Sequence, residues 1–457
     1  MADLAKSAAI EIVRTLRDRG YQAYLVGGCV RDLLLGREPA DWDVSTDARP
    51  EDVMRIFPKT WAVGAQFGVV LVPIESVVSD HPITRSPDHL MTIEVATFRS
   101  DGLYTDGRHP DEVTYSQDPR EDVQRRDFTI NGLLLDPTTN QVLDFVGGLA
   151  DLHHEIIRTI GSPEKRFGED KLRMLRAVRF AARFGYKIDA DTMRAIRELA
   201  PQIAQVSRER VRDELTKMLT EGRARRAFEL LDETGLLHEV LPEVEKMKGV
   251  KQPPQFHPEG DVWIHTLLML EMLPPNASRT LAWGALLHDV GKPPTFRVAP
   301  DRIRFDNHVE VGVAMAEDIG RRLRMSNDDI EQIVALVGQH MRFADALKMK
   351  PSTLKRFLRQ LRFAEHLEMH RIDCLASHGD LAIYEYLRKT LEETRPEEIR
   401  PRPLLTGHDL LAMGYKPGPS FREILAALED AQLEGRITTR EQAVDLVRRE
   451  YPVTAPA

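Results

Sequence analysis

Hydrophobic and polar positions follow two different patterns along the 457-residue chain. Through about residue 155, β-branched runs alternate with short helical stretches, and we predict strands at AYLVG, WDVST, FGVVLVPI and LMTIEVATF. From about Asp151 onward, apolar residues recur at helical spacing in long segments such as EDKLRMLRAVRFAARFG and SNDDIEQIVALVGQHM. The pattern therefore predicts an α+β fold, in which a compact N-terminal domain with a small sheet precedes an all-α assembly.

Two proline-rich segments interrupt the helical part, KQPPQFHPEG at 251–260 and RPEEIRPRPLL at 395–405. Proline and glycine at this density are typical of linkers. A chain of this length also exceeds what one hydrophobic core normally organises. We therefore expect four parts, at residues 1–155, 156–250, 251–385 and 386–457.

Composition argues against a membrane protein and against a disulfide-stabilised protein. The chain has 42% hydrophobic and 30% charged residues, and it contains no apolar run near the roughly 18 residues of a membrane span. Its two cysteines, Cys29 and Cys374, are too far apart in sequence to indicate a disulfide framework. We predict a cytoplasmic protein without membrane attachment.

Paired carboxylates give the first indication of chemistry. A predicted strand leads into the turn Gly27-Gly28, then a short helix carrying Arg31, then a strand bearing Asp41 and Asp43. Residues two apart on a strand share a face, so these carboxylates can hold Mg²⁺, and two ions would suit phosphoryl transfer. Gly28 lets backbone amides approach a triphosphate, and Arg31 adds a cation.

The order GGCVRDLLLG followed by DWD resembles the class II tRNA nucleotidyltransferase and poly(A) polymerase family. The resemblance implies a polymerase-β-like head, a helical neck and body, Mg²⁺ at the head, and tRNA, ATP and CTP as partners. It continues in QRRDFTINGLLLD at 124–136, which we read as the start of a helix. There it implies nucleotide binding by Arg126, and sugar or structural contacts by Asp127 and Asn131.

A basic helix is the next matching block. Within 164–187 the arginines Arg173, Arg176, Arg179 and Arg183 recur at steps of three or four, and we expect more positive charge than local acids can pair, although net charge is −9. The resemblance makes Asp170 and Arg173 a protein template that selects C and A. It assigns Arg176 and Arg179 to the incoming nucleotide and leaves Arg183 structural or RNA-facing.

A polar, glycine-containing stretch at 95–116 resembles the flexible loop of the family. The resemblance implies that enzymes adding only CC lack a complete loop, which disfavours that product. CCA addition, A-only addition and poly(A) synthesis stay open, and we favour CCA addition.

Histidines and aspartates in the helical half indicate a second metal site. The pair His288-Asp289 follows the apolar run AWGALL and precedes GKP, and the surrounding blocks resemble an HD domain. That resemblance implies a divalent metal of unknown identity, hydrolysis of phosphate esters, and the ligands His265, His288, Asp289 and Asp373, with His308 and His340 for a second ion. We read the other helical histidines, His257, His366 and His378, as ordinary core or surface residues.

Two rival hypotheses come from other classes of protein. In one, the chain is an HD phosphohydrolase whose head is a regulatory nucleotide-binding module. In the other, it is a non-catalytic RNA-binding scaffold, because the helical tail from about Pro401 could dock partners and is predicted to contact RNA. The pattern of residues does not indicate an oligomeric state.

Overall fold

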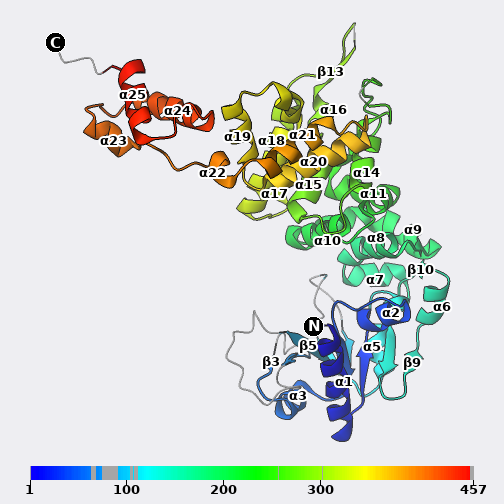
Figure 1. Cartoon of the computed structure of the whole chain (residues 1–457). Coiled ribbons are helices and arrows are strands. Elements are labelled where there is room, and N and C mark those ends of the chain that lie inside the picture. Colours follow the sequence, from blue (N-terminus) through cyan, green and yellow to red (C-terminus); the bar gives the residue numbers. More distant parts are fainter. Residues whose placement is uncertain are drawn as a thin grey trace. The chain divides into compact units, whose positions relative to one another are not determined.

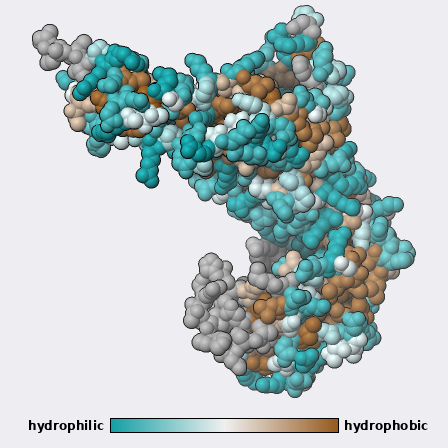
Figure 2. Space-filling model, in the orientation of Figure 1, coloured by the Kyte–Doolittle hydropathy of each residue, from teal (hydrophilic) through white to brown (hydrophobic). Residues whose placement is uncertain are grey.

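The computed structural model describes residues 2–62, 68–74, 91–102, 107, 112–255, 257–300 and 302–452. The chain divides into two compact units, Met1–Glu245 and Lys246–Ala457 (Figure 1). Among the described residues, no helix is both long enough and apolar enough to cross a membrane. On the face drawn in Figure 2, hydrophilic side chains cover most of the surface, with apolar side chains between them.

A seven-stranded mixed sheet forms the centre of the head. Its order is β3 (Trp61–Ala62), β4 (Val69–Pro73), β5 (Thr92–Thr97), β2 (Asp43–Thr46), β1 (Ala23–Val26), β8 (Leu133–Asp136), β9 (Gln141–Asp144). All neighbouring pairs are antiparallel except β2 with β5, which run parallel. The four predicted strands are confirmed, and β3, β8 and β9 were not predicted.

The head also contains α1 (Ala2–Asp18), α2 (Gly28–Leu34), α3 (Pro50–Ile56), α5 (Pro119–Gln124) and the 3-10 turn η3 (Thr129–Asn131). Strands β6 (Arg99–Asp101) and β7 (Val113–Tyr115) pair beside the sheet. Both strands lie within the predicted flexible loop at 95–116, of which 103–106 and 108–111 lie outside the described residues.

Helices continue the first unit after the sheet. They are α6 (Gly148–His153), α7 (Pro163–Glu169), α8 (Leu172–Phe184), α9 (Ala190–Leu199), η4 (Ala200–Gln205), α10 (Arg208–Thr220), α11 (Ala224–Glu233), α12 (Leu236–Val240) and α13 (Pro242–Glu245). A parallel pair of short strands, β10 (Ile156–Ile157) and β11 (Lys187–Ile188), lies among them. Helix α8 is central because its apolar side, including Met174, Leu175 and Val178, is fully buried.

Among the described residues of the second unit, the regular structure is helical except for one hairpin, β12 (Phe296–Val298) with β13 (Ile303–Phe305). Its helices are α14 (Val262–Glu271), α15 (Arg279–Leu287), α16 (Lys292–Thr295), α17 (His308–Arg322), α18 (Asn327–Gln339), η5 (His340–Lys348), α19 (Pro351–Leu358), α20 (Phe363–Ala376), α21 (Ala382–Glu393), α22 (Pro396–Ile399), α23 (Gly407–Ala412), α24 (Pro419–Leu433) and α25 (Arg440–Glu450). The last three helices share a core of their own around Leu410, Ile424 and Val447.

Three expectations about local structure are wrong. The block at 124–136 is not the start of a helix, because α5 ends at Gln124 and the chain passes through η3 into β8. Strand β2 begins at Asp43, so Asp41 precedes it in a bend. The long helix expected through EDKLR breaks at Asp170, whose backbone is extended and whose carboxylate accepts a hydrogen bond from Leu172 N at 3.0 Å, where α8 begins.

Candidate nucleotidyltransferase and metal sites

The glycine turn brings backbone close to a basic side chain. Gly27 follows β1 with φ +76°, a left-handed conformation that glycine adopts without strain. A Cβ on Gly27 would lie 3.3 Å from Nη1 of Arg126, so a larger residue would press on that guanidinium. Arg126 is held there by Asp122, at 3.0 Å from Nη2 to Oδ2. The turn and Arg126 thus form one wall of a cavity.

Three carboxylates gather at the start of β2. Asp43 is paired in register with Glu94 of the parallel strand β5, so the two side chains leave the same face of the sheet. Burial raises the pKa of Asp43 to about 6, aided by the negative charges of Glu94 and Asp41 and opposed by Arg126. Burial and Asp41 also raise the pKa of Glu94. Mutual repulsion between carboxylates is relieved by a divalent cation, so the donor set fits Mg²⁺ or a similar hard ion.

A cavity of about 440 Å³ in the first unit joins the separate motifs. Its lining includes the predicted residues Gly28, Arg31, Asp43, Arg126, Asp170, Arg173 and Arg176. Five of these seven residues lie in three elements, α2, β2 and α8, and the other two lie in connections between elements, so only the fold brings them together. The cavity volume falls in the range of small-ligand sites.

The predicted template pair faces this cavity, and each member is held by a partner. Asp170 accepts hydrogen bonds from both terminal nitrogens of Arg210, at 2.6 and 3.2 Å. Arg173 donates to Glu169 at 2.7 Å and to the carbonyl oxygen of Arg125 at 3.3 Å. These contacts fix the direction in which the carboxylate and the guanidinium are presented.

Asp127 joins the sheet-bearing part of the unit to α8. Its Oδ2 accepts hydrogen bonds from Nε and Nη2 of Arg176, at 2.9 and 2.7 Å, and its Oδ1 accepts from Asn131 at 3.0 Å. Burial acts to raise the pKa of Asp127, but Arg176 and Asn131 hold it well below its usual value. Asn131 in turn accepts from the buried Arg31. Asp127 and Asn131 are therefore bonded within the protein.

Arg179 does not line the cavity. It is buried and donates to Glu214 at 2.7 Å and to Glu221 at 3.1 Å, and Arg183 also donates to Glu221, at 3.2 Å. Of the four arginines of α8, Arg173 alone has a local partner, Glu169. Acids distant in sequence pair with the other three, so the positive charge does exceed what local acids pair, and the fold supplies the remaining partners. A nucleotide-binding role for Arg179 stays an untested prediction, and its observed contacts are within the protein.

Four histidines of the second unit converge on two aspartates. His288 ends α15, His308 begins α17, and His340 ends α18. Each places its Nδ1 2.7–2.9 Å from a carbonyl oxygen three residues earlier, namely those of Ala285, Phe305 and Val337. This contact fixes each ring with Nε2 turned inward, which is the usual support of a metal-binding imidazole.

Donor atoms within 4.8 Å of one another form three groups, one of which is His257 with Glu259 and His265. The two groups made of predicted ligands are His265 with His288 and Asp373, and Asp289 with His308 and His340. The Nε2 atoms of all four histidines and Oδ1 of Asp289 are buried without a hydrogen-bond partner among the described residues, whereas Oδ2 of Asp289 lies 2.7 Å from Lys292 Nζ. Buried polar atoms without a partner are costly, and a divalent ion in each group would satisfy them. The residues present therefore fit metal ions. All six predicted ligands lie in these two groups.

Gly291 explains why the pair His288-Asp289 can lie against α17. A Cβ on Gly291 would lie 2.0 Å from the backbone oxygen of His308 and 2.6 Å from the nitrogen of Gly312. Only glycine permits this approach, which brings Asp289 to the side of His308 and His340. The same turn places Lys292 Nζ 2.7 Å from Asp289 Oδ2 and 2.6 Å from Gln252 Oε1.

Comparison with known proteins matches three parts of the chain to family models. Residues 23–158 match a poly A polymerase head domain, residues 185–248 match a probable RNA and SrmB-binding site of polymerase A, and residues 261–371 match an HD domain. The CCA-adding enzyme of Geobacillus sp. (strain WCH70) is 32% identical over 444 residues, which cover 95% of each chain. The chain belongs to the CCA-adding enzyme family.

Other family members match half or nearly all of the chain. The CCA-adding enzyme of Geobacillus stearothermophilus is 45% identical over 228 residues, and this match covers 50% of the chain and about half, 53%, of that enzyme. The crystal structure of the Bacillus stearothermophilus CCA-adding enzyme in complex with CTP has a TM-score of 0.73 and 30% identity, and covers 97% of each chain. A Thermotoga maritima CCA-adding enzyme complexed with tRNA shares the fold at 18% identity, with a TM-score of 0.56.

Sequence reasoning missed Glu94, Arg125 and Arg210. Glu94 is the only acid in the strand run TIEVAT, and an acid flanked by buried β-branched residues is a signal that could have been used. Arg210 lies 40 residues from Asp170, so no local pattern joins them. Arg125 stands beside the predicted Arg126, but its carbonyl contact to Arg173 depends on the fold.

Proposed function

We propose that this chain adds C, C and A to the 3′ end of tRNA, using CTP and ATP. The observation that carries the proposal is the single cavity in which Asp43, Arg126, Arg176 and the pair Asp170 and Arg173 meet. It joins groups suited to phosphoryl transfer with groups suited to reading a base. Membership of the CCA-adding enzymes, with relatives described with CTP and tRNA, favours the same reaction.

In this reaction the tRNA 3′-oxygen bonds to the α-phosphorus of the nucleotide, the bond from that phosphorus to the bridging oxygen breaks, and pyrophosphate leaves. We propose Mg²⁺ ions at Asp41 and Asp43, with Glu94 beside them. Bound there, they supply activation of the hydroxyl and neutralisation of the pyrophosphate. Arg126 and Arg176 are the cations that face the cavity to hold the phosphates.

Base choice follows from what Asp170 and Arg173 can still accept and donate. Oδ1 of Asp170 already receives Leu172 N and Arg210, whereas Oδ2 receives Arg210 alone. Because each carboxylate oxygen has two acceptor sites, Oδ2 can accept the amino group of C or A while Arg173 donates to the ring. U and G present a carbonyl oxygen where C and A carry the amine, so they are repelled by Asp170.

Product sequencing tests this function. Purified chain is incubated with tRNA lacking its 3′ end and with CTP and ATP, separately and together. We expect two C residues followed by one A. A single A would indicate A-only addition and a long A tail would indicate a poly(A) polymerase. Asp43→Ala should abolish extension, and exposed Asp191→Asn should leave it unchanged.

We propose hydrolysis of phosphate esters at the histidine centre as a second activity, favoured by the two groups of inward-facing donor atoms. In it, water oxygen bonds to phosphorus, the phosphorus to ester oxygen bond breaks, and the water proton passes to the leaving oxygen. Bound divalent ions supply hydroxide at neutral pH. Incorporation that fails while hydrolysis persists would favour the regulatory-head hypothesis, and RNA binding without either activity would favour the scaffold. A cytoplasmic location and RNA contact by 386–457 stay predictions.

A further inference from the structure

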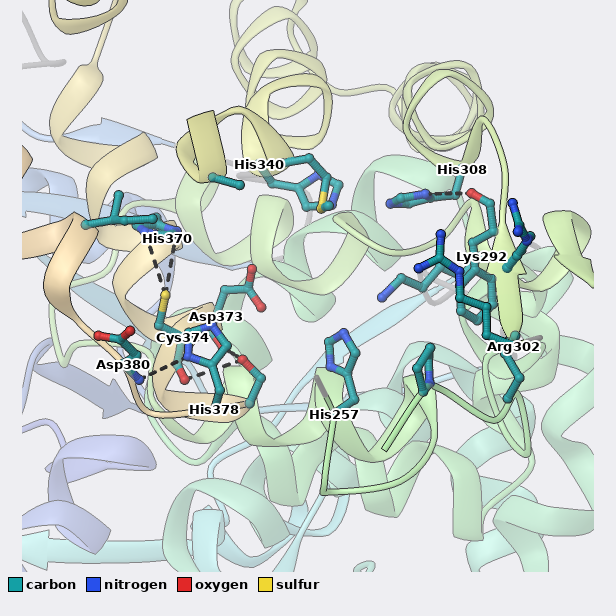
Figure 3. A pocket seen from close by; sticks show the side chains of 18 of the residues that line it. His257, Lys292, Arg302, His308, His340, His370, Asp373, Cys374, His378 and Asp380 are labelled. Carbon is teal, nitrogen blue, oxygen red and sulfur yellow. Dashed lines mark hydrogen bonds between the residues drawn. The ribbon is translucent and has the colours of Figure 1, made fainter. Parts of the chain in front are cut away.

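The hairpin β12–β13 stands beside the histidine centre and contributes to its cavity (Figure 1). This cavity has a volume of about 550 Å³ and is lined by ligand candidates His308, His340 and Asp373 together with Lys292, Arg302 and Arg304. In Figure 3, Lys292 and Arg302 lie on the side opposite His370 and Cys374, with His340, Asp373 and His257 between them. One wall of the cavity is therefore basic.

The basic character continues along the hairpin. Arg297 lies directly opposite Arg304 in the antiparallel register, so these two like charges share a face. Arg302 directly precedes β13. Like charges placed directly opposite destabilise a two-stranded pair. Asp306 offsets part of this repulsion through a 2.6 Å ion pair with Arg297. Basic side chains gathered on one hairpin raise the local concentration of anions, so this surface suits a ligand with several negative charges.

The other face of the hairpin is apolar; its β13 residues Ile303 and Phe305 line the cavity, and its β12 residues are exposed. Phe296 and Val298 are 39% and 71% exposed, and Phe296 lies opposite Phe305, with ring centroids 5.9 Å apart. Two-stranded hairpins are only marginally stable alone, so exposed aromatic and aliphatic side chains on one are unfavourable without a ligand. Basic residues next to exposed aromatic rings are the combination that binds single-stranded nucleic acid, through phosphates and stacked bases.

We propose that the hairpin β12–β13 is an RNA-binding arm of the histidine centre, which selects a phosphate ester carried by an RNA strand over the same ester on a small molecule. The proposal rests on the hydrolytic activity proposed above. The ester phosphate lies at the two metal groups, and the neighbouring phosphates of the strand lie along Arg302 and Arg304. A mononucleotide has no neighbouring phosphate to use these arginines.

The test compares substrates on the full chain, with Mg²⁺, Mn²⁺ and Ni²⁺ tried separately. The substrates are p-nitrophenyl phosphate, bis(p-nitrophenyl) phosphate, a nucleoside 3′-monophosphate, and a labelled short single-stranded RNA ending in either a 3′-phosphate or a 3′-hydroxyl. The two RNAs distinguish hydrolysis of a terminal ester from hydrolysis of an internal diester. The variants are Arg302→Ala, Arg304→Ala and Arg302→Lys, and the matched control is Arg321→Ala, an exposed arginine of α17 that does not line the cavity.

For Arg302→Ala and Arg304→Ala we expect kcat/KM on RNA to fall about tenfold, as for loss of one charge-assisted contact. Hydrolysis of the small substrates should change less than about twofold, since the basis of discrimination is the neighbouring phosphate. The slope of log kcat/KM against log salt should become shallower by roughly 0.7 per arginine. Arg302→Lys should recover most of the activity on RNA, and Arg321→Ala should match the parent.

Equal losses on RNA and on the small substrates, or no loss on RNA, would overturn the RNA-binding arm while leaving the hydrolase intact. If the parent chain does not prefer RNA to the mononucleotide, the RNA-binding arm is overturned as well. Absence of hydrolysis of every substrate with every metal would instead refute the hydrolytic activity and the arm with it. Incorporation of C and A by the same variants should be unchanged, which separates both results from the transferase.

Discussion

The ion pair between Asp127 and Arg176 should contribute strongly to the stability of the first unit. Asp127→Asn keeps the shape of the side chain but removes the charge that two nitrogens of Arg176 contact at 2.7 and 2.9 Å. Removing one partner of a fully buried pair costs about 3–5 kcal/mol. Because the side chain of Arg176 is 31% exposed, solvent screens part of this loss, and we expect about 2–3 kcal/mol.

A double-mutant cycle separates the pair from its surroundings. The variants Asp127→Asn, Arg176→Met and their combination are compared by hydrogen exchange of α8 peptides in increasing urea, because a whole-chain signal would mix the two units. The double variant leaves no uncompensated charge, so we expect a coupling free energy of at least about 1.5 kcal/mol. As a control, the exposed pair Asp191 and Arg194 should give a coupling below about 0.5 kcal/mol. Purely additive effects at Asp127 and Arg176 would refute this account of how α8 is held.

Three further outcomes follow from the two sites. Glu94→Gln should lower kcat for C incorporation by about a hundredfold, as expected for loss of transition-state charge stabilisation, and a Mg²⁺ titration unchanged from the parent would contradict a role beside Asp43. Gly291→Ala should abolish metal binding at the histidine centre, measured by calorimetry, yet leave C incorporation intact, because its Cβ would lie 2.0 Å from His308 O. The depressed pKa of Asp127 means that its stabilisation is complete above the unfolded pKa of about 4 and is lost as pH falls toward the folded value. The melting temperatures of the parent and Asp127→Asn should therefore converge in acid, and a constant difference from neutral pH to about pH 3 would exclude this cause.

The sequence predicted well where the signal was local. Strands such as 23–26 and 43–46 show alternating or continuous burial over a few residues, and the pair His288-Asp289 stands in an apolar run that ends at a glycine. The resemblance to an HD domain supplied the six candidate ligands of the histidine centre, which occur in five short blocks of the sequence. That His265, His288 and Asp373 form one group could be seen only in the fold, which brings together α14, α15 and α20.

Predictions failed where a contact distant in sequence decides the structure. Positive charge along α8 exceeds what local acids can pair, but the sequence could not show that Glu214 and Glu221, from the α10 region, pair with Arg179. The break between α7 and α8 arises because Asp170 accepts from a backbone amide and from Arg210, 40 residues later. The spacing of apolar residues carries no information on these hydrogen-bond partners of Asp170, so it predicted one continuous helix.

Nucleotide choice by Asp170→Ala tests the central claim most directly, because the claim is that protein side chains replace a template. Steady-state incorporation of each of the four nucleotides is measured on tRNA lacking its 3′ end, for the parent and the variant, with Asp191→Asn as control. The account predicts that the parent accepts C and then A while rejecting U and G. It predicts that the variant loses at least about tenfold of this discrimination, the loss expected when one charge-assisted hydrogen bond distinguishes the bases. A variant that is slower but selects C and A as sharply as the parent would contradict it.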